Sequence, residues 1–395
     1  MPSLSELGTN GADFEVPEVN RFLTMTGEVQ KNPELSWSQE RLRPEITPLG
    51  LKGYFNPAVI PRSDGSITLL ARHVEKVAEY GLPDVGSLVE ITLMHDGERY
   101  QVLEKNTIWN PEDSPEALLE DVRALNDPNG EDKRVFLGAT VVMDHTIVDE
   151  YGNTKVEKSP YGAIAILDNE GQISNSPKMF RSCPELGIGK NMTPLDMKGN
   201  FLFREEGVNG DHNHILSIIH YDKATDTVTK TGELDFREHM KDKPWGKWRI
   251  GTTATLPTDD STQALVLHGI NAEPTDQNPY GAYLRYAFGL ACLERSSDGE
   301  MRIVGVDPQP MAVPDDFLDE NNVRLAQQLH PELRDPIYLC GQVKRIDRSG
   351  ILRIDQFPSI GDTEIVLGSY PHARVEDRKE KIYEAQKSHE FQIAT

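Results

Sequence analysis

Short apolar runs bounded by turn-forming residues recur along the chain from Leu51 onward. Compact turns such as Ser63-Asp64-Gly65 and Asn169-Glu170-Gly171 join several of them. Short runs that are rich in β-branched residues are typical of strands. The strands predicted in this way are Ile67–Ala71, Val135–Met143, Ala163–Leu167, Asn200–Phe203, Ile215–His220, Ala264–His268, Ala287–Leu293, Met301–Val306 and Ile365–Leu367. The pattern therefore predicts an all-β protein.

Helical patterns are few. Ser114-Pro115-Glu116 predicts a short helical turn that runs into Leu118-Leu119, because Ser caps a helix and Pro suits its first turn. A second helix is predicted within Pro314–Leu329. A third is predicted over Val375–His389, where Glu/Lys pairs are typical of a surface helix. The all-β body is thus expected to end in a short C-terminal helix.

Five polar clusters repeat at a loose interval. They are Asn56-Pro57, Glu120-Asp121, Gly189-Lys190, Gly251-Thr252 and Cys340-Gly341, at separations of 64, 69, 62 and 89 residues. A four-stranded propeller blade needs about 40–50 residues, so each interval has room for one decorated blade. Each cluster is followed by an apolar strand, so equivalent strands would carry all five to one face. The chain then divides into an N-terminal extension (1–48), a propeller (49–375) and a helical tail (376–395).

Charge limits the partners that this chain can have. Asp and Glu number 64 against 41 Lys and Arg, which gives a formal net charge of −23. Such a field repels nucleic acid and anionic membranes, and no run of Lys or Arg counters it. The first twenty residues lack the pattern of a signal peptide, and no apolar stretch is long enough to span a bilayer. A cytoplasmic protein without nucleic-acid or membrane partners is expected.

The three cysteines are widely scattered. Cys183, Cys292 and Cys340 lack the spacing of metal ligands. The sequence therefore predicts no metal site, and reduced thiols fit the expected compartment.

The first two clusters carry groups suited to a sugar. Asn56 precedes a proline, which favours an extended backbone and leaves its amide to bind a pair of sugar hydroxyls. In Glu120-Asp121-Val122-Arg123, strand alternation would place Asp121 and Arg123 on one face and Glu120 on the other. An ordinary turn at Asn56 and a solvated surface pair at Glu120-Asp121 are the alternative interpretations.

The later clusters add positive charge and a histidine. Lys190 and Arg204 lie near strand ends and suit an anion such as phosphate, although Glu205 and Glu206 could instead pair with Arg204. His268 closes an apolar strand, a position that suits either a pocket or a structural hydrogen bond. Trp245 and Trp248 share one loop, where they would either stack on substrate or anchor the loop itself.

Taken in order, these motifs resemble glycoside hydrolase family 130, whose members are inverting mannoside phosphorylases and mannosidases on a five-bladed propeller. Asn56-Pro57 and a strand ending in Arg72 match the family's opening pattern. Glu120-Asp121-Val122-Arg123 is similar to its Glu-Asp-Pro-Arg signature, with valine in place of proline. The remaining matches, which extend the resemblance over residues 51–375, are Lys190, Asn191, Arg204, Gly251–Pro257, His268-Gly269, Tyr283 and Cys340-Gly341. The last strand, Val366–Tyr370, lacks an aspartate that the family usually carries.

The resemblance implies a glycoside phosphorylase or an inverting glycoside hydrolase acting on β-mannosides or related oligosaccharides. Asp121 would be the general acid in a central pocket. The expected substrate-binding residues are Asn56, Arg72, Glu120, Arg123 and Asn191, and the expected phosphate-binding residues are Arg72, Lys190, Arg204, His268 and Tyr283. Phosphorolysis is a glycosyl transfer to inorganic phosphate as co-substrate and needs no other cofactor. Hydrolysis instead needs a carboxylate base about 6.5–9.5 Å from the acid, for which Glu205 and Glu206 are the candidates.

Two other interpretations stay open. An arabinan- or fructan-cleaving hydrolase on a related propeller would need three acidic residues from separate blades. A non-catalytic carbohydrate-binding propeller would need aromatic platforms, and the chain has 4 Trp. A homo-oligomer in which residues 1–48 brace a neighbouring subunit is also open.

Overall fold

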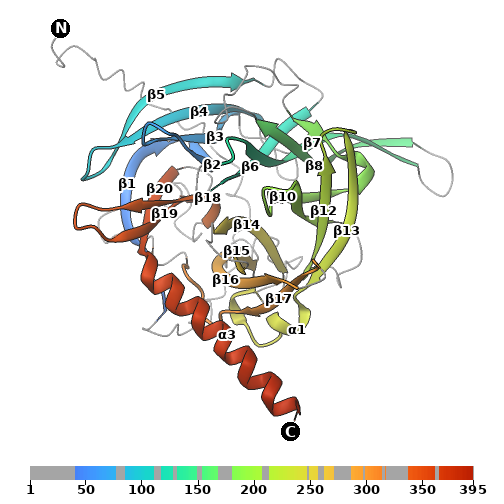
Figure 1. Cartoon of the computed structure of the whole chain (residues 1–395). Helices are drawn as coiled ribbons and strands as arrows, with labels where there is room; N and C mark the ends of the chain where they lie inside the picture. The colour runs from blue at the N-terminus through green and yellow to red at the C-terminus, as the bar shows by residue number, and fades with distance from the viewer. Residues whose placement is uncertain are drawn as a thin grey trace, which may run out of the picture.

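The computed structural model consists almost entirely of antiparallel strands around a common centre (Figure 1). It describes residues 41–76, 85–110, 117–127, 131–148, 154–167, 180–206, 213–246, 249–256, 262–270, 286–296, 299–313, 316, 337–360 and 364–394. Within these ranges the strands form five four-stranded sheets. The protein is a five-bladed β-propeller, as the sequence predicts.

Four blades are meanders in which the chain runs from the innermost to the outermost strand. Blade 1 holds β2 (Tyr54–Pro61), β3 (Ser66–Lys76), β4 (Val85–His95) and β5 (Tyr100–Trp109). Blade 2 holds β6 (Ala117–Asn126), β7 (Val135–Val148), β8 (Thr154–Leu167) and β9 (Arg181–Ser182). Blade 3 holds β10 (Gly189–Pro194), β11 (Asn200–Glu205), β12 (Ile215–Asp222) and β13 (Thr227–Asp235). Blade 4 holds β14 (Arg249–Leu256), β15 (Thr262–Ile270), β16 (Tyr286–Arg295) and β17 (Met301–Val306).

Blade 5 closes the ring with a strand from the start of the chain. Its sheet runs β18 (Ile337–Ile346), β19 (Leu352–Ile360), β20 (Glu364–Pro371) and β1 (Glu45–Lys52). β1 pairs antiparallel with β20, from Glu45 opposite Ser369 to Lys52 opposite Glu364. The first and last strands of the described chain therefore pair within one sheet.

The predicted strands are all found, and one predicted helical turn is wrong where it continues into Leu118-Leu119; its start, Ser114-Pro115-Glu116, lies outside the described residues. Each of the nine apolar runs lies inside a strand, in β3, β7, β8, β11, β12, β15, β16, β17 and β20. Leu118 and Leu119 are expected in a helical turn but lie in β6, because both are buried between blades 1 and 2 and packing overrides the local signal. Most of Pro314–Leu329 lies outside the described residues. The short helices are η3 (Pro184–Leu186), α1 (Arg237–Met240) and η5 (Pro244–Gly246).

The core is divided into five hydrophobic clusters, one between each pair of neighbouring blades. β15 shows why its apolar run is continuous. Leu265 and Leu267 pack toward blade 3, while Ala264 and Val266 pack toward blade 5. A middle strand of a blade is covered on both faces, so successive side chains are all buried.

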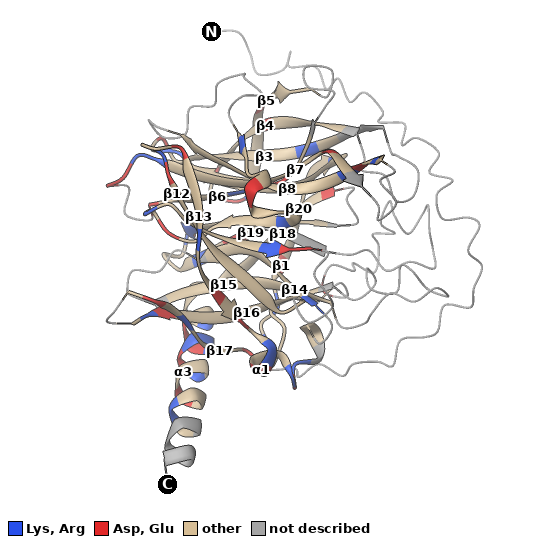
Figure 2. Cartoon of the chain, turned by 90° about the vertical axis from the view of Figure 1, so that its right-hand side faces the viewer, with Lys and Arg blue, Asp and Glu red and all other residues tan. Residues whose placement is uncertain are grey.

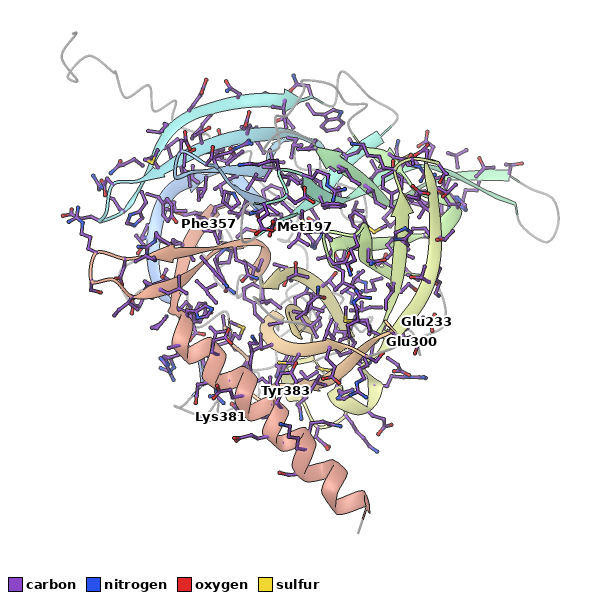
Figure 3. All side chains as sticks on the ribbon, viewed as in Figure 1. Met197, Glu233, Glu300, Phe357, Lys381 and Tyr383 are labelled. Atoms are coloured by element: carbon purple, nitrogen blue, oxygen red, sulfur yellow. The ribbon has the colours of Figure 1, made fainter. Side chains whose placement is uncertain are left out.

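The C-terminal helix α3 (His372–Ala394) packs on the outside of blades 4 and 5 (Figure 1). Val375 and Ile382 enter the cluster between these blades, and Arg378 lies 3.8 Å from the buried carboxylate of Asp307. Figure 3 labels Tyr383, which packs against the same cluster, and Lys381, which is exposed. The predicted helix is confirmed, and one of its faces is buried.

Charge is dispersed over the described surface, with Lys and Arg interspersed among Asp and Glu on the strands and along α3 (Figure 2). None of the described helices has the length and apolar composition needed to cross a bilayer.

Candidate active site at the centre of the propeller

The inner strand of every blade is interrupted by a β-bulge at the same place. The register shifts lie between Phe55 and Ala58 in β2, Glu120 and Arg123 in β6, Lys190 and Thr193 in β10, Thr252 and Ala254 in β14, and Leu339 and Gln342 in β18. These are the five polar clusters of the sequence. The clusters lie within the inner strands rather than before them. A bulge turns a side chain out of the regular hydrogen-bonding pattern of its strand.

Three bulge residues have left-handed backbone. Asn56, Asp121 and Asn191 have φ of 49°, 53° and 61°, and among the described non-glycine residues only Asp226 joins them. Asn and Asp tolerate this region because their short polar side chains bond locally. The expectation that Pro57 holds Asn56 extended is wrong. Three polar side chains are instead presented from equivalent points of blades 1, 2 and 3.

A belt of hydrogen bonds links residues from all five blades, and it passes through the bulges of blades 1, 2 and 3. Ser359 of blade 5 donates from Oγ to Asn56 Oδ1 at 2.6 Å, and Asn56 Nδ2 donates to Asp121 Oδ1 at 2.6 Å. Arg123 donates from one terminal nitrogen to the Asp121 carbonyl at 2.7 Å and from the other to Asn191 Oδ1 at 3.0 Å. Thr252 Oγ1 of blade 4 donates to the Asn191 carbonyl at 2.8 Å. The belt fixes Asp121, which is only partly buried, between buried neighbours.

The expected alternation at Glu120-Asp121-Val122-Arg123 is wrong because the bulge interrupts it. Glu120 pairs with Arg72 of blade 1 at 3.1 Å, and Asp121 also faces blade 1 through Asn56. Arg123 turns toward blade 3, where Asn191 accepts its hydrogen bond. Val122, at the position where the signature that this segment resembles has proline, is 2% exposed in the core between blades 1 and 2. The signature's polar residues therefore remain at the centre while its third residue packs inward.

Three of the predicted basic residues occupy one equivalent position. Arg72, Arg204 and His268 lie on the second strand of blades 1, 3 and 4, opposite Phe55, Lys190 and Gly251. The first two of these partners directly precede the bulge, and Gly251 lies one pair before it. Blades 2 and 5 carry Thr140 and Pro358 there. Their separations, 132 residues from Arg72 to Arg204 over two blades and 64 residues from Arg204 to His268 over one, match the loose interval of the polar clusters. The antiparallel register gives this interval its structural meaning.

Lys190, Arg204 and Glu206 form the charged part of the site. Arg204 lies opposite Lys190 and is paired with Glu206 at 2.5 Å. Burial alone would lower the pKa of Lys190, but the nearby Glu206 and Glu120 raise it above its ordinary value. Burial alone would raise the pKa of Glu206, but Arg204 and Lys190 lower it. At neutral pH these groups are therefore all charged.

His268 stays neutral among cations. It is 5% exposed, and burial together with the charges of Arg204, Arg123 and Arg249 lowers its pKa well below the ordinary value. A Cβ added at Gly251 would lie 2.4 Å from His268 Cε1 and 2.6 Å from Asn191 Nδ2, so this ring, this amide and this glycine are packed together. His268 can offer a hydrogen bond to a ligand but adds no positive charge.

Positive charge is in local excess. Among the described residues, the cations of this cluster are Arg72, Arg123, Lys190, Arg204 and Arg249, and its carboxylates are Glu120, Asp121 and Glu206. Five cations against three carboxylates leave two positive charges in a chain whose formal net charge is −23. The cluster can therefore attract an anion that the rest of the molecule repels.

Other predicted residues lie apart from this cluster. Glu205 faces outward, where Ser217 Oγ and the exposed Lys230 Nζ donate to it at 2.6 and 2.8 Å. Trp245 is fully buried and donates from Nε1 to the carbonyl of Asp307 at 3.1 Å, so it anchors its loop. Tyr283 and Trp248 lie outside the described residues.

Sequence reasoning misses three residues of the site. Ser359 and Thr252 join the belt, and Arg249 adds a charge beside Glu206 and His268. Thr252 is visible only as part of the Gly251-Thr252 cluster. Ser359 and Arg249 follow no motif, and only their contacts across blades identify them. No group of His, Cys, Asp and Glu suited to a metal ion is found in the described ranges.

Neither a protein-family model nor a curated protein sequence matches the chain. Solved structures do share its fold. A β-1,2-mannobiose phosphorylase from Listeria innocua, in complex with β-1,2-mannobiose, has a TM-score of 0.54 at 14% identity, covering 85% of this chain and 96% of that chain. A glycosyl hydrolase from Bacteroides ovatus has a TM-score of 0.49 at 14% identity, with coverages of 86% and 96%. A mannose phosphorylase from Leishmania mexicana, in complex with a phosphate ion, has a TM-score of 0.43 at 12% identity, with coverages of 85% and 89%.

Proposed function

We propose that this chain is a carbohydrate-active enzyme that cleaves a glycosidic bond with inversion and transfers the sugar to inorganic phosphate. The observation that supports this best is the placement of Asp121 beside a cluster with an excess of positive charge. An acid and an anion site are the two elements that an inverting phosphorylase needs. The fold, shared with a β-1,2-mannobiose phosphorylase, makes β-mannosides the first substrates to test.

Asp121 acts as the general acid. It is partly exposed, so its carboxyl group can reach a substrate, and Asn56 holds one of its oxygens. The proton of Asp121 passes to the leaving oxygen as the bond from that oxygen to the anomeric carbon breaks. A phosphate oxygen forms the new bond on the opposite sugar face, which gives a sugar 1-phosphate of inverted configuration and a free hydroxyl. Solvent returns the proton to Asp121.

Lys190, Arg204 and Arg249 hold the phosphate in this scheme. Glu206 offsets one of the two positive charges of Lys190 and Arg204. Binding of a phosphate dianion therefore needs Arg249 as a third cation. The neutral imidazole of His268 adds a hydrogen bond without adding charge. Arg72 and Arg123 are engaged by Glu120 and Asn191, which favours a substrate-binding role for both.

Hydrolysis is less well supported because neither Glu205 nor Glu206, the two candidate bases, is suited to activate water. A base that activates water works best with a pKa near the operating pH. Arg204 and Lys190 lower the pKa of Glu206, which makes its carboxylate a weak base. Glu205 accepts hydrogen bonds from Ser217 and Lys230 on the outer strands. With phosphate as nucleophile, the protein needs no base.

An arabinan- or fructan-cleaving hydrolase and a non-catalytic carbohydrate-binding propeller are less consistent with the site. An arabinan- or fructan-cleaving mechanism needs acids from three blades. The polar clusters of the five inner strands carry Asn56, Asp121, Asn191, Thr252 and Cys340 beside their register shifts, and one of these residues is acidic. A binding module needs an aromatic platform, and Trp245 is in the core.

The test is turnover of a panel of β-mannosides and related disaccharides with and without phosphate. Formation of a sugar 1-phosphate only in the presence of phosphate is expected, with its anomeric configuration read by NMR. Release of free sugar regardless of phosphate would make the enzyme a hydrolase. No turnover of any substrate would favour the binding module.

A further inference from the structure

Ser359 lies two blades away from the catalytic carboxylate but is connected to it through one residue. It is on β19 of blade 5, fully buried, and bonded to Asn56 twice. Its Oγ accepts from the Asn56 backbone N–H at 2.9 Å and donates to Asn56 Oδ1 at 2.6 Å. Asn56 Nδ2 then donates to Asp121 Oδ1 at 2.6 Å. Three side chains from blades 5, 1 and 2 are thus joined in series.

The donor and acceptor roles in this series follow from the groups at its two ends, the Asp121 carboxyl and the Ser359 hydroxyl. Asp121 Oδ1 accepts here, and the proton that a general acid transfers is then carried by the other carboxyl oxygen, so the Asn56 amide must present its NH₂ to Oδ1. The amide oxygen then faces blade 5, where it needs a donor, and the Ser359 hydroxyl supplies one. A flipped amide would place an oxygen against the Asp121 carboxylate and break both bonds.

The backbone of Asn56 makes this support necessary. Asn56 has a φ of 49° at the bulge, where the regular ladder no longer holds it in register. The bond from its backbone N–H to Ser359 Oγ replaces the missing ladder bond. One serine hydroxyl therefore fixes both the strained backbone and the amide of Asn56.

We propose that Ser359 is a positioning residue for the reaction: it holds the Asn56 amide in the one orientation that places and hydrogen-bonds the Asp121 carboxylate. The catalytic part of this inference rests on the proposed function. The structural part, that Ser359 controls the orientation of the Asn56 amide, does not depend on which reaction is catalysed.

The experiment compares Ser359→Ala with Ser359→Cys, which keeps the side-chain size but offers only a weak S–H donor. The side-chain amide signals of Asn56, assigned through Asn56→Asp, report the orientation directly in nitrogen-15 NMR spectra. Loss of one hydrogen bond should raise the hydrogen-exchange rate of this NH₂ about tenfold in both variants. The kcat for phosphorolysis should fall about tenfold with KM changed by less than about threefold.

Two controls separate positioning from general destabilisation. The first control is Ser369→Ala. Ser369 is buried on the neighbouring strand β20, and its hydroxyl donates to Asp355 at 2.6 Å. This variant should leave the Asn56 signals and kcat unchanged. In an Asn56→Ala background, Ser359→Ala should cause a much smaller loss of kcat than in the unmodified protein, because the amide that Ser359 orients is absent and only the bond to the backbone N–H of residue 56 remains.

The outcomes are distinguishable. Unchanged Asn56 signals in folded Ser359→Ala and Ser359→Cys, or an additive double variant, would overturn the proposal. If no glycoside is turned over by the unmodified protein, the proposed function fails, but faster exchange of the Asn56 amide in both variants still supports the positioning role.

Discussion

Asn56 and Asp121 face each other across the boundary between blades 1 and 2, with 2.6 Å between Nδ2 and Oδ1, and both have positive φ. Two residues that are 65 positions apart in sequence thus share an uncommon backbone conformation and one hydrogen bond. A β-bulge at the same point of each inner strand makes this possible. Both side chains are turned out of the ladder and toward the centre, and the predictions below depend on this placement.

Asp121→Asn should abolish turnover. The amide has nearly the same shape but no proton of suitable acidity, so a loss of about 10²- to 10⁴-fold in kcat is expected. Asp144→Asn is the matched control, since Asp144 lies in an exposed part of β7 and pairs with Lys158 at 2.8 Å. Retained turnover in a folded Asp121→Asn protein would contradict the role of Asp121 as acid.

Lys190→Ala should weaken phosphate binding. Lys190 lies opposite Arg204, and its loss leaves Arg204 paired with Glu206 and removes one of the two excess positive charges. A charge-assisted hydrogen bond is worth enough to raise the Kd for phosphate about 10- to 100-fold. Titration calorimetry with inorganic phosphate measures this. Lys381→Ala, on the exposed side of α3, should leave the affinity unchanged.

Gly251→Ala should distort the site without a change of charge. The added Cβ would lie 2.4 Å from the His268 ring and 2.6 Å from the Asn191 amide, so one of them must move. A displacement of about 1 Å at such a site lowers kcat about a hundredfold. In Gly232→Ala the nearest atom is Ile218 Cδ1 at 3.5 Å, an ordinary contact. Equal activities of these two variants would show that the packing around Gly251 is unimportant.

His268 should make the protein less stable in mild acid. Its pKa is lowered by burial and by Arg204, Arg123 and Arg249, so the unfolded chain binds a proton more readily than the folded one. Stability is then fully present above an unfolded-state pKa of about 6.5 and is lost as the pH falls below it. His268→Gln should flatten the decrease in Tm between about pH 7.5 and about pH 5.5. An unchanged slope, measured by differential scanning calorimetry, would argue that the imidazole is already protonated in the folded state.

Asp355→Ala should weaken the closure of the ring. Asp355 is fully buried in blade 5 and accepts from Tyr100 of blade 1 at 3.0 Å and from Arg345 at 2.5 Å. Removal of one partner of a buried ion pair costs about 3–5 kcal/mol of the free energy of unfolding, because the remaining charge is left without compensation. Urea unfolding measures the loss. Asp377→Ala, at an exposed ion pair of α3, should cost less than about 1 kcal/mol.

The sequence by itself determined nine of the described strands and the polar positions that interrupt the inner strands. Both are local properties: a run such as Ala264–His268 is apolar throughout because its strand is covered on both faces, and Asn56, Asp121 and Asn191 are residues that tolerate a left-handed backbone. The five polar clusters lie on the five inner strands.

Only the tertiary structure decided how these positions combine. The antiparallel register placed Arg72, Arg204 and His268 at equivalent points of their second strands, and the bulge overturned the alternation expected around Asp121. Ring closure brought Ser359 to Asn56, 303 residues away. The charge state of His268 and the pairing of Glu206 depend on burial and on neighbours from other strands. Distances between blades depend on how five sheets pack around one centre, and no local pattern encodes them.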